Sequence, residues 1–149
     1  SYWHDVIGYN YKMTNICAAI GLSQLETIKK ILQDKRKIYL YYKKHLESCP
    51  LKFQVENHNS INSFWLVGCL TANKKTRDQL MKYLKMRKIE TRPGFYPINT
   101  MPMYKNYNNQ KFKISKQLSD KIICFPSYPK LTKKDLNFIC DTIKKFFKK

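Results

Sequence analysis

The stretch that decides the fold is WHDVIGYNYKMTNICAAIGLSQL, residues 3–25. Its first part, Trp3 to Met13, is rich in aromatic residues and is typical of an irregular loop. At Thr14–Asn15 a side chain can accept from the free backbone N–H groups of a first helical turn, so the sequence predicts a helix from this point. Small residues interleaved with the apolar ones allow another backbone to approach this helix closely. A loop that ends on a helix N-terminus also suits an anion such as a phosphate.

Beyond this stretch the sequence predicts alternating helices and short strands. Apolar residues continue at a three-to-four spacing, which indicates one long helix or two joined helices over residues 14–48, ended by Pro50. Strands are expected at 51–56, 63–72, 89–91 and 122–125, helices at 77–88, 114–120 and from the Thr132–Asp135 capping box to about Phe147, and an irregular polar segment at 98–112. This order predicts an α+β layer, a small sheet with helices against one face.

Length and composition limit the class of protein. A chain of 149 residues with 43% hydrophobic residues can form one domain with a modest core. No apolar run approaches the roughly 20 residues that span a bilayer. The first ten residues lack the basic start and the apolar run of a signal peptide, so we expect a cytoplasmic protein with no membrane partner.

The cysteines indicate a reducing compartment. There are five, Cys17, Cys49, Cys69, Cys124 and Cys140, and their odd number and wide spacing argue against a disulfide framework. We expect them to be small buried residues. The three histidines are scattered and no pair has the spacing of metal ligands, so no metal site is predicted.

The net charge of +19 has two explanations. One is a polyanionic partner such as nucleic acid. The other is a lysine-rich composition that arises from A/T-rich codons, which also explains the abundance of Asn, Ile and Tyr. We favour the second, because the basic residues are mostly lysines spread along the chain rather than gathered in one stripe.

Three blocks, in order, resemble one enzyme family. They are Gly8-Tyr9-Asn10-Tyr11-Lys12-Met13-Thr14-Asn15-Ile16-Cys17-Ala18-Ala19-Ile20-Gly21-Leu22-Ser23-Gln24-Leu25-Glu26, Glu90-Thr91-Arg92-Pro93-Gly94-Phe95-Tyr96-Pro97 and Phe125-Pro126-Ser127-Tyr128-Pro129. The first closely resembles the motif GYNYRMTNIQAAIGLAQLE of the DegT/DnrJ/EryC1/StrS family of pyridoxal-phosphate-dependent aminotransferases, which act on nucleotide-linked keto-sugars. The resemblance covers only the C-terminal part of such an enzyme. It implies the small domain of a fold-type-I aminotransferase, with a cofactor and interface loop at 1–13, a connecting helix at 14–48 and a small α+β domain at 49–149.

The resemblance also implies a set of site residues. The family's active site lies at a dimer interface, so Asn10 is the candidate to hydrogen-bond the phosphate of the neighbouring subunit's pyridoxal phosphate; an amide donor suits phosphate, which offers only acceptors. Arg92, held extended by Pro93, could grip a carboxylate or diphosphate of the substrate. Tyr96 could hydrogen-bond sugar or phosphate oxygens. Lys12 stands where the family has arginine and keeps the charge but not the planar fork.

The lysine that forms a Schiff base with the cofactor lies upstream of the GYNY block in the family. No lysine of this sequence has that context, so we assign no catalytic residue and expect this stretch alone not to transaminate. The favoured hypothesis is the C-terminal part of a homodimeric enzyme that moves an amino group from glutamate to a keto-deoxy-sugar nucleotide. The alternatives are a non-catalytic chain that stands alone or pairs with a catalytic subunit, and, least supported, a basic nucleic-acid-binding module.

Overall fold

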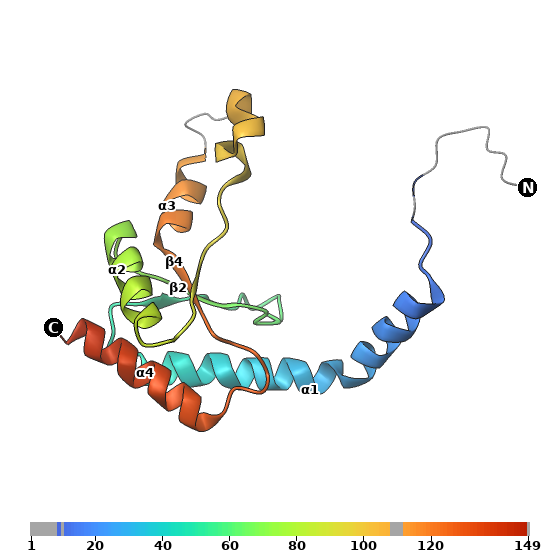
Figure 1. Cartoon of the computed structure of the whole chain (residues 1–149), viewed down its shortest axis with the longest axis horizontal. Helices are drawn as coiled ribbons and strands as arrows, with labels where there is room; N and C mark the ends of the chain where they lie inside the picture. Colours follow the sequence, from blue (N-terminus) through green and yellow to red (C-terminus); the bar gives the residue numbers. More distant parts are fainter. Residues whose placement is uncertain (1–8, 10, 108–111, 149) are drawn as a thin grey trace, which may run out of the picture.

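A computed structural model describes residues 9, 11–107 and 112–148 of the chain (Figure 1). Helices and strands alternate in the predicted order, with short 3-10 helices before α3. The elements are α1 (Asn15–His45), β1 (Lys52–Phe53), β2 (Val67–Leu70), α2 (Lys74–Lys85), β3 (Arg92–Pro93), η1 (Ile98–Thr100), η2 (Pro102–Tyr107), α3 (Lys113–Lys121), β4 (Ile122–Phe125) and α4 (Lys133–Phe147). None of the described helices combines the length and apolar character that crossing a bilayer requires.

The strands form one antiparallel sheet in the order β1-β2-β4-β3. The two central strands, β2 and β4, are the apolar segments VGCL and IICF, and the two edge strands have two residues each. Val67 is opposite Phe125 and Cys69 is opposite Ile123, so these four buried side chains point to the same face of the sheet.

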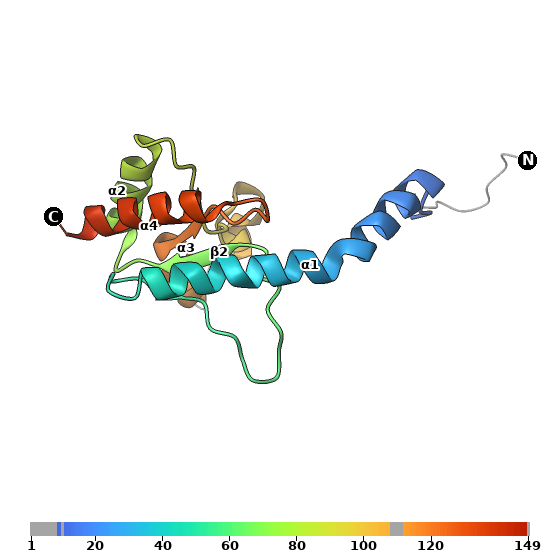
Figure 2. The same cartoon turned by 90° about the horizontal axis from the view of Figure 1, so that it is seen from below.

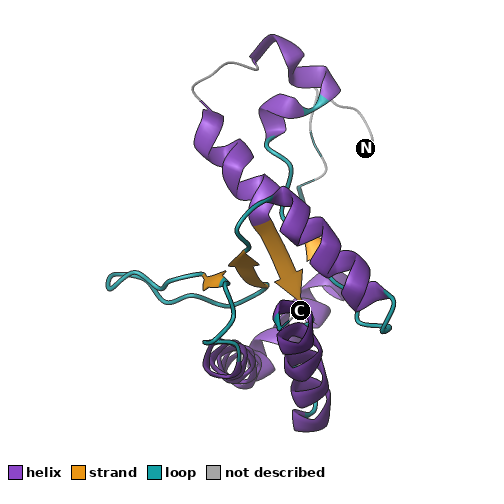
Figure 3. Ribbon diagram, turned by 90° about the vertical axis from the view of Figure 1, so that its left-hand side faces the viewer, coloured by secondary structure: helices purple, strands orange, loops and turns teal. Residues whose placement is uncertain are grey.

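Helices α1, α2 and α4 cover that face (Figure 3). One core cluster joins the four sheet residues to apolar residues of all three helices, among them Tyr42, Leu80 and Ile143, whose side chains are completely buried. The amphipathic spacing predicted for α4 supplies its share of this core. The predicted α+β architecture, a small sheet with helices on one face, is therefore confirmed.

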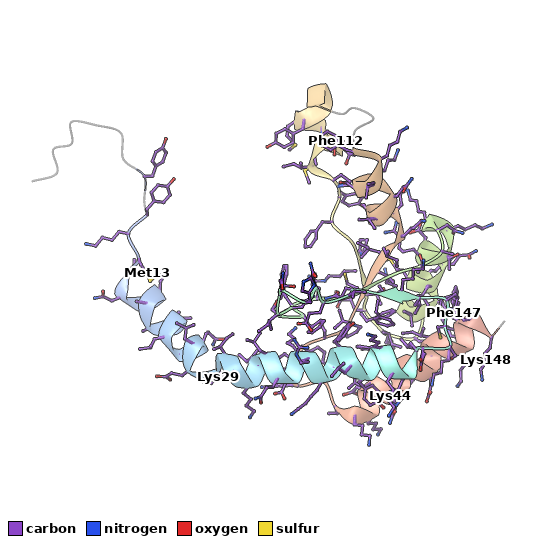
Figure 4. The ribbon with its side chains drawn as sticks, turned by 180° about the vertical axis from the view of Figure 1, so that it is seen from behind. Met13, Lys29, Lys44, Phe112, Phe147 and Lys148 are labelled. Atoms are coloured by element: carbon purple, nitrogen blue, oxygen red, sulfur yellow. The ribbon has the colours of Figure 1, made fainter. Side chains whose placement is uncertain are left out.

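Only the last third of α1 belongs to this core. Thr14 caps the helix as predicted, its Oγ1 accepting from the Cys17 N–H at 3.3 Å. From residue 15 to residue 30 every side chain is exposed, and the first buried ones are Ile38 and Tyr39. The helix bends near Lys29, and its N-terminal half projects away from the sheet (Figures 2 and 4).

This projection explains one wrong prediction. Cys17 is exposed on the free half of α1, whereas Cys49, Cys69, Cys124 and Cys140 are buried free thiols. Burial of a helical residue depends on a neighbour to pack against, and none of the described elements reaches Cys17.

Several predicted boundaries are also wrong. The strand expected at 89–91 lies at Arg92–Pro93 instead, because pairing with Cys124 and Ile123 of β4 decides its position. The strand expected at 51–56 has only two residues, because the side chain of Gln54 accepts the Gly68 N–H at 3.0 Å and ends the ladder. The segment 98–112, predicted to be irregular, contains η1 and η2.

Candidate functional site

A hollow of about 620 Å³ lies at the β3 edge of the sheet. Five segments far apart in the sequence enclose it: α1, the residues before β2, the approach to β3, the end of β4 with the loop that follows, and the first half of α4. Its lining residues are Lys35, Trp65, Leu66, Arg87, Lys88, Ile89, Glu90, Thr91, Arg92, Cys124, Phe125, Pro126, Ser127, Tyr128, Leu131, Asp135, Phe138 and Ile139. Apolar walls with a few converging polar groups are typical of small-molecule sites.

Arg92 belongs to β3, the edge strand of the sheet that borders this hollow. It is opposite Cys124 of β4, and its side chain is 77% exposed, with Nη2 3.8 Å from Oε1 of the equally exposed Glu90. Such an exposed pair is weak, so the guanidinium remains available to a ligand. Gly94 fixes the chain just beyond: a Cβ there would lie 2.9 Å from the Cβ of Ile122, so only glycine allows this close approach to β4.

Lys35 extends from α1 to the hollow. Its Nζ donates to the carbonyl oxygen of Trp65 at 3.0 Å. Burial lowers the pKa of Lys35 from its ordinary value, because desolvation disfavours the charged form. The Ser127 hydroxyl also donates to the Trp65 carbonyl, at 3.5 Å. The backbone of Trp65 is therefore held by α1 and by the loop that follows β4.

The residue before Trp65 is held in an uncommon conformation. Phe64 has φ 48°, in the left-handed region that non-glycine residues rarely adopt. Its N–H donates to Oδ1 of Asn62 at 2.8 Å, and its buried ring stacks on Tyr39 with centroids 4.0 Å apart. The guanidinium of Arg36 lies over the same ring, 5.1 Å from its centroid. These contacts fix the backbone turn that presents Trp65.

The Trp65 side chain is 66% exposed and lies beside another exposed ring, that of Phe95, which is 74% exposed. The two ring planes are 23° from parallel and their centroids are 6.3 Å apart. Exposed aromatic rings offer a ligand a large flat apolar area.

Charge in the hollow is mainly positive. Among its lining residues, the cations Lys35, Arg87, Lys88 and Arg92 outnumber the carboxylates Glu90 and Asp135. Hydrogen bonds from Thr132 lower the pKa of Asp135, which forms the capping box of α4 and so has a structural partner. The arrangement favours an anionic ligand.

The predicted site residues do not all meet in the structure. Arg92 lines the hollow, whereas Tyr96 is 70% exposed and is not among the lining residues. Lys12 is exposed and precedes the free half of α1, which begins beside Met13, well away from the sheet (Figure 4). Asn10 lies outside the described residues. The roles of Asn10, Lys12 and Tyr96 stay predictions.

Sequence reasoning did not find Lys35, Trp65 or Phe95. Lys35 is one of many lysines in a helix and nothing local distinguishes it. Trp65 stands in SFWLVGCL, within the strand expected at 63–72, although the strand begins only at Val67. Phe95 follows Gly94 between Pro93 and Pro97, and this stiff setting was the one available signal.

Comparison with known proteins identifies the family. The sequence profile of the DegT/DnrJ/EryC1/StrS aminotransferase family matches residues 1–144. The GDP-perosamine synthase of Escherichia coli O157:H7 is 44% identical over 146 residues, which are 98% of this chain and 40% of that protein. The GDP-perosamine synthase of Vibrio cholerae is 40% identical over 149 residues, covering 98% of this chain and 41% of the relative.

The fold agrees with this result. A DegT DnrJ EryC1 StrS aminotransferase from Brucella abortus superposes with a TM-score of 0.86 at 22% identity, covering all of this chain and 40% of the other. The chain thus spans about 40% of the length of the relatives that it matches. Members of the family depend on pyridoxal phosphate. This chain belongs to the DegT/DnrJ/EryC1/StrS aminotransferase family.

Proposed function

We propose that this chain is the C-terminal part of an aminotransferase that makes a GDP-linked amino sugar, with glutamate as the amino donor and a GDP-linked keto-deoxy-sugar as the acceptor. The observation that carries the proposal is the 44% identity to a GDP-perosamine synthase over nearly the whole chain. The excess of cations around the hollow supports it, because a sugar nucleotide carries a diphosphate.

Pyridoxal phosphate would carry the amino group between donor and acceptor. The described residues suit its phosphate: the chain passes from an exposed loop at Tyr11 and Lys12 directly into the N-terminus of a 31-residue helix, whose positive dipole end favours anions. We assign Asn10 to the phosphate of the neighbouring subunit in a cytoplasmic homodimer, and Lys12 and Tyr96 to the substrate. The lysine to which the cofactor is attached would come from the upstream part of the enzyme, so the 149-residue chain alone should not transaminate.

The test uses the complete enzyme, in which this chain follows an upstream family domain. We expect the absorbance of bound pyridoxal phosphate, and glutamate-dependent formation of an amino sugar from a GDP-linked keto-deoxy-sugar. Asn10→Ala should release cofactor more readily, whereas Asn73→Ala, which removes only the cap of α2, should not. A complete enzyme that binds no pyridoxal phosphate would refute the proposal.

A further inference from the structure

Lys35 has different surroundings from the other lysines of α1. Its side chain is half-buried and lines the hollow, and its Nζ donates to the carbonyl oxygen of Trp65 at 3.0 Å. The other lysines of this helix are all exposed: Lys29, Lys30, Lys37, Lys43 and Lys44. Among the ion pairs of the described residues, none includes Lys35. Its amine therefore has a neutral hydrogen-bond partner and no paired carboxylate that would hold the proton.

We propose that Lys35 is a site of covalent modification, at which its amine is acylated by a small acyl phosphate that the cations of the hollow attract. In this reaction the neutral amine attacks the carbonyl carbon of the acyl phosphate. A C–N bond forms and the C–O bond to the phosphate breaks. The phosphate leaves with that electron pair and takes the proton of the amine, so the products are an N-acyl lysine and inorganic phosphate.

The first argument is the state of the amine. A lysine becomes an effective nucleophile when desolvation or a neighbouring cation favours its neutral form. Burial lowers the pKa of Lys35, so a larger fraction of it is neutral than of an exposed lysine at the same pH. The Trp65 carbonyl can accept from the neutral amine as well as from the ammonium. This hydrogen bond therefore keeps Nζ at the hollow in both states.

The second argument is the charge around the amine. The other charged residues that line the hollow are three cations and two carboxylates: Arg87, Lys88, Arg92, Glu90 and Asp135. Asp135 is engaged in the capping box of α4, and the Glu90 side chain is 83% exposed. A recessed surface with an excess of one charge raises the local concentration of the opposite ion. An acyl phosphate is therefore concentrated beside the amine, whereas a neutral acylating agent is not.

The third argument is access. A hollow of about 620 Å³ has the size of sites that admit drug-sized ligands, which are much larger than acetyl phosphate. Buried thiols of the core are nucleophiles of the opposite kind. Cys140 is only 1% exposed, and burial raises the pKa of its thiol to about 12, so the reactive thiolate is scarce and enclosed. Lys35 combines partial burial with an open approach.

Acylation would change the hollow in two ways. The Nζ atom becomes an uncharged amide nitrogen, so the four cations of the lining fall to three. The hydrogen bond to the Trp65 carbonyl loses its charged donor and becomes weaker. Modification of Lys35 should therefore lower the affinity of the hollow for anions.

The experiment treats the 149-residue chain with acetyl phosphate and measures the rate of acetylation at each lysine, by mass spectrometry of its peptides at low conversion. We expect Lys35 to react about tenfold faster than Lys29 and Lys44, two exposed lysines of the same helix (Figure 4). Inorganic phosphate should slow the reaction at Lys35 and not at the other two. In concentrated urea the three rates should become equal.

Two variants test the part of the cations. Arg92→Gln should lower the rate at Lys35 severalfold and leave Lys29 and Lys44 unchanged, because it removes a cation that attracts the phosphate. Lys52→Gln is the matched control, since it removes a cation from β1, at the opposite edge of the sheet. It should leave the rate at Lys35 unchanged.

Three results would overturn the inference. The first is a rate at Lys35 no faster than at Lys29 and Lys44, and the second is an equal effect of Arg92→Gln and Lys52→Gln. The third is a preference for Lys35 that persists in urea, because it would then arise from the local sequence and not from the hollow. The inference does not depend on the proposed function: a complete enzyme that binds no pyridoxal phosphate would refute that function whether or not Lys35 is acetylated.

Discussion

At the scale of single residues, Gly94 holds the candidate site together. A Cβ at this position would lie 2.9 Å from the Cβ of Ile122 and 3.0 Å from its Cγ2, so Gly94→Ala must push β3 away from β4. We expect a loss of about 1–3 kcal/mol in the free energy of unfolding, measured with urea. Gly21→Ala is the control, because the added methyl group has no described atom within 4 Å beyond its chain neighbours and the nearby backbone of its own helix. Equal effects of the two substitutions would contradict this role of Gly94.

The ion pair between Arg36 and Glu56 makes stability depend on pH. The guanidinium donates to both carboxylate oxygens, at 2.8 and 2.6 Å, and the Asn62 N–H donates to the same carboxylate. The bond from Arg36, and then that from Asn62, lower the pKa of Glu56 to about 2.

A lowered folded-state pKa means that this stabilisation is complete above the ordinary value of 4.5 and is lost as the pH falls towards about 2. Urea unfolding across that window should therefore show a smaller slope with pH in Glu56→Gln than in the parent chain. Glu47→Gln, which removes an exposed carboxylate just after α1, should keep the parent slope. An unchanged slope in Glu56→Gln would show that the pair does not form in solution.

At the scale of elements, two helices carry the same kind of cap but differ in what the cap supports. Thr132 and Asp135 form the capping box of α4, which packs in the core, whereas Thr14 caps the free half of α1. Thr132→Ala should lower the free energy of unfolding by about 1 kcal/mol. Thr14→Ala should reduce helical circular dichroism without moving the urea midpoint. A shift of that midpoint by Thr14→Ala would mean that the free half is packed.

The same contrast explains how far the sequence predicts the fold. The capping box of α4, the apolar run of β4 and the break at Pro50 act over a few residues, and the elements that they define lie within three residues of their expected bounds. The helix expected at 77–88 begins earlier, at Lys74, because the side chain of Asn73 caps its first turn. The edge strand β3 was misplaced because its position depends on pairing with β4, about thirty residues later in the chain. The exposure of Cys17 likewise depends on what packs against α1.

The residues of the candidate site also fall into two groups, those that the sequence could indicate and those that only the folded chain brings together. Arg92 could be proposed from the sequence, because it stands in a block that resembles the family and Pro93 holds it extended, and the structure places it on the lining of the hollow. Lys35 and Trp65 could not, because their hydrogen bond joins residues thirty positions apart, and only the packing of α1 on the sheet brings them together.

At the scale of the whole molecule, the free half of α1 is the feature that the rest of the fold does not explain. Residues 15–25 contain no charged side chain. Ile16 and Ile20 share one side of the helix, and Leu25, nine residues after Ile16, is on the opposite side at 100° per residue. A helix that is apolar on opposite sides is normally enclosed by other elements. These residues are 59–73% exposed here, in a chain that spans about 40% of its relatives.

This half of α1 should therefore make the isolated chain bind an apolar fluorescent dye and associate with itself. Replacing Ile16, Ile20 and Leu25 by glutamine should reduce dye fluorescence and shift sedimentation towards the monomer. It should leave the urea midpoint unchanged, because none of the three touches the core.

Ile38→Gln is the matched contrast on the same helix. It places an amide in the core, where the parent side chain is only 4% exposed, and should lower the free energy of unfolding by about 2–5 kcal/mol. If the triple substitution lowered the urea midpoint as Ile38→Gln does, the N-terminal half of α1 would have to pack on the folded chain in solution. Its apolar residues would then already be covered.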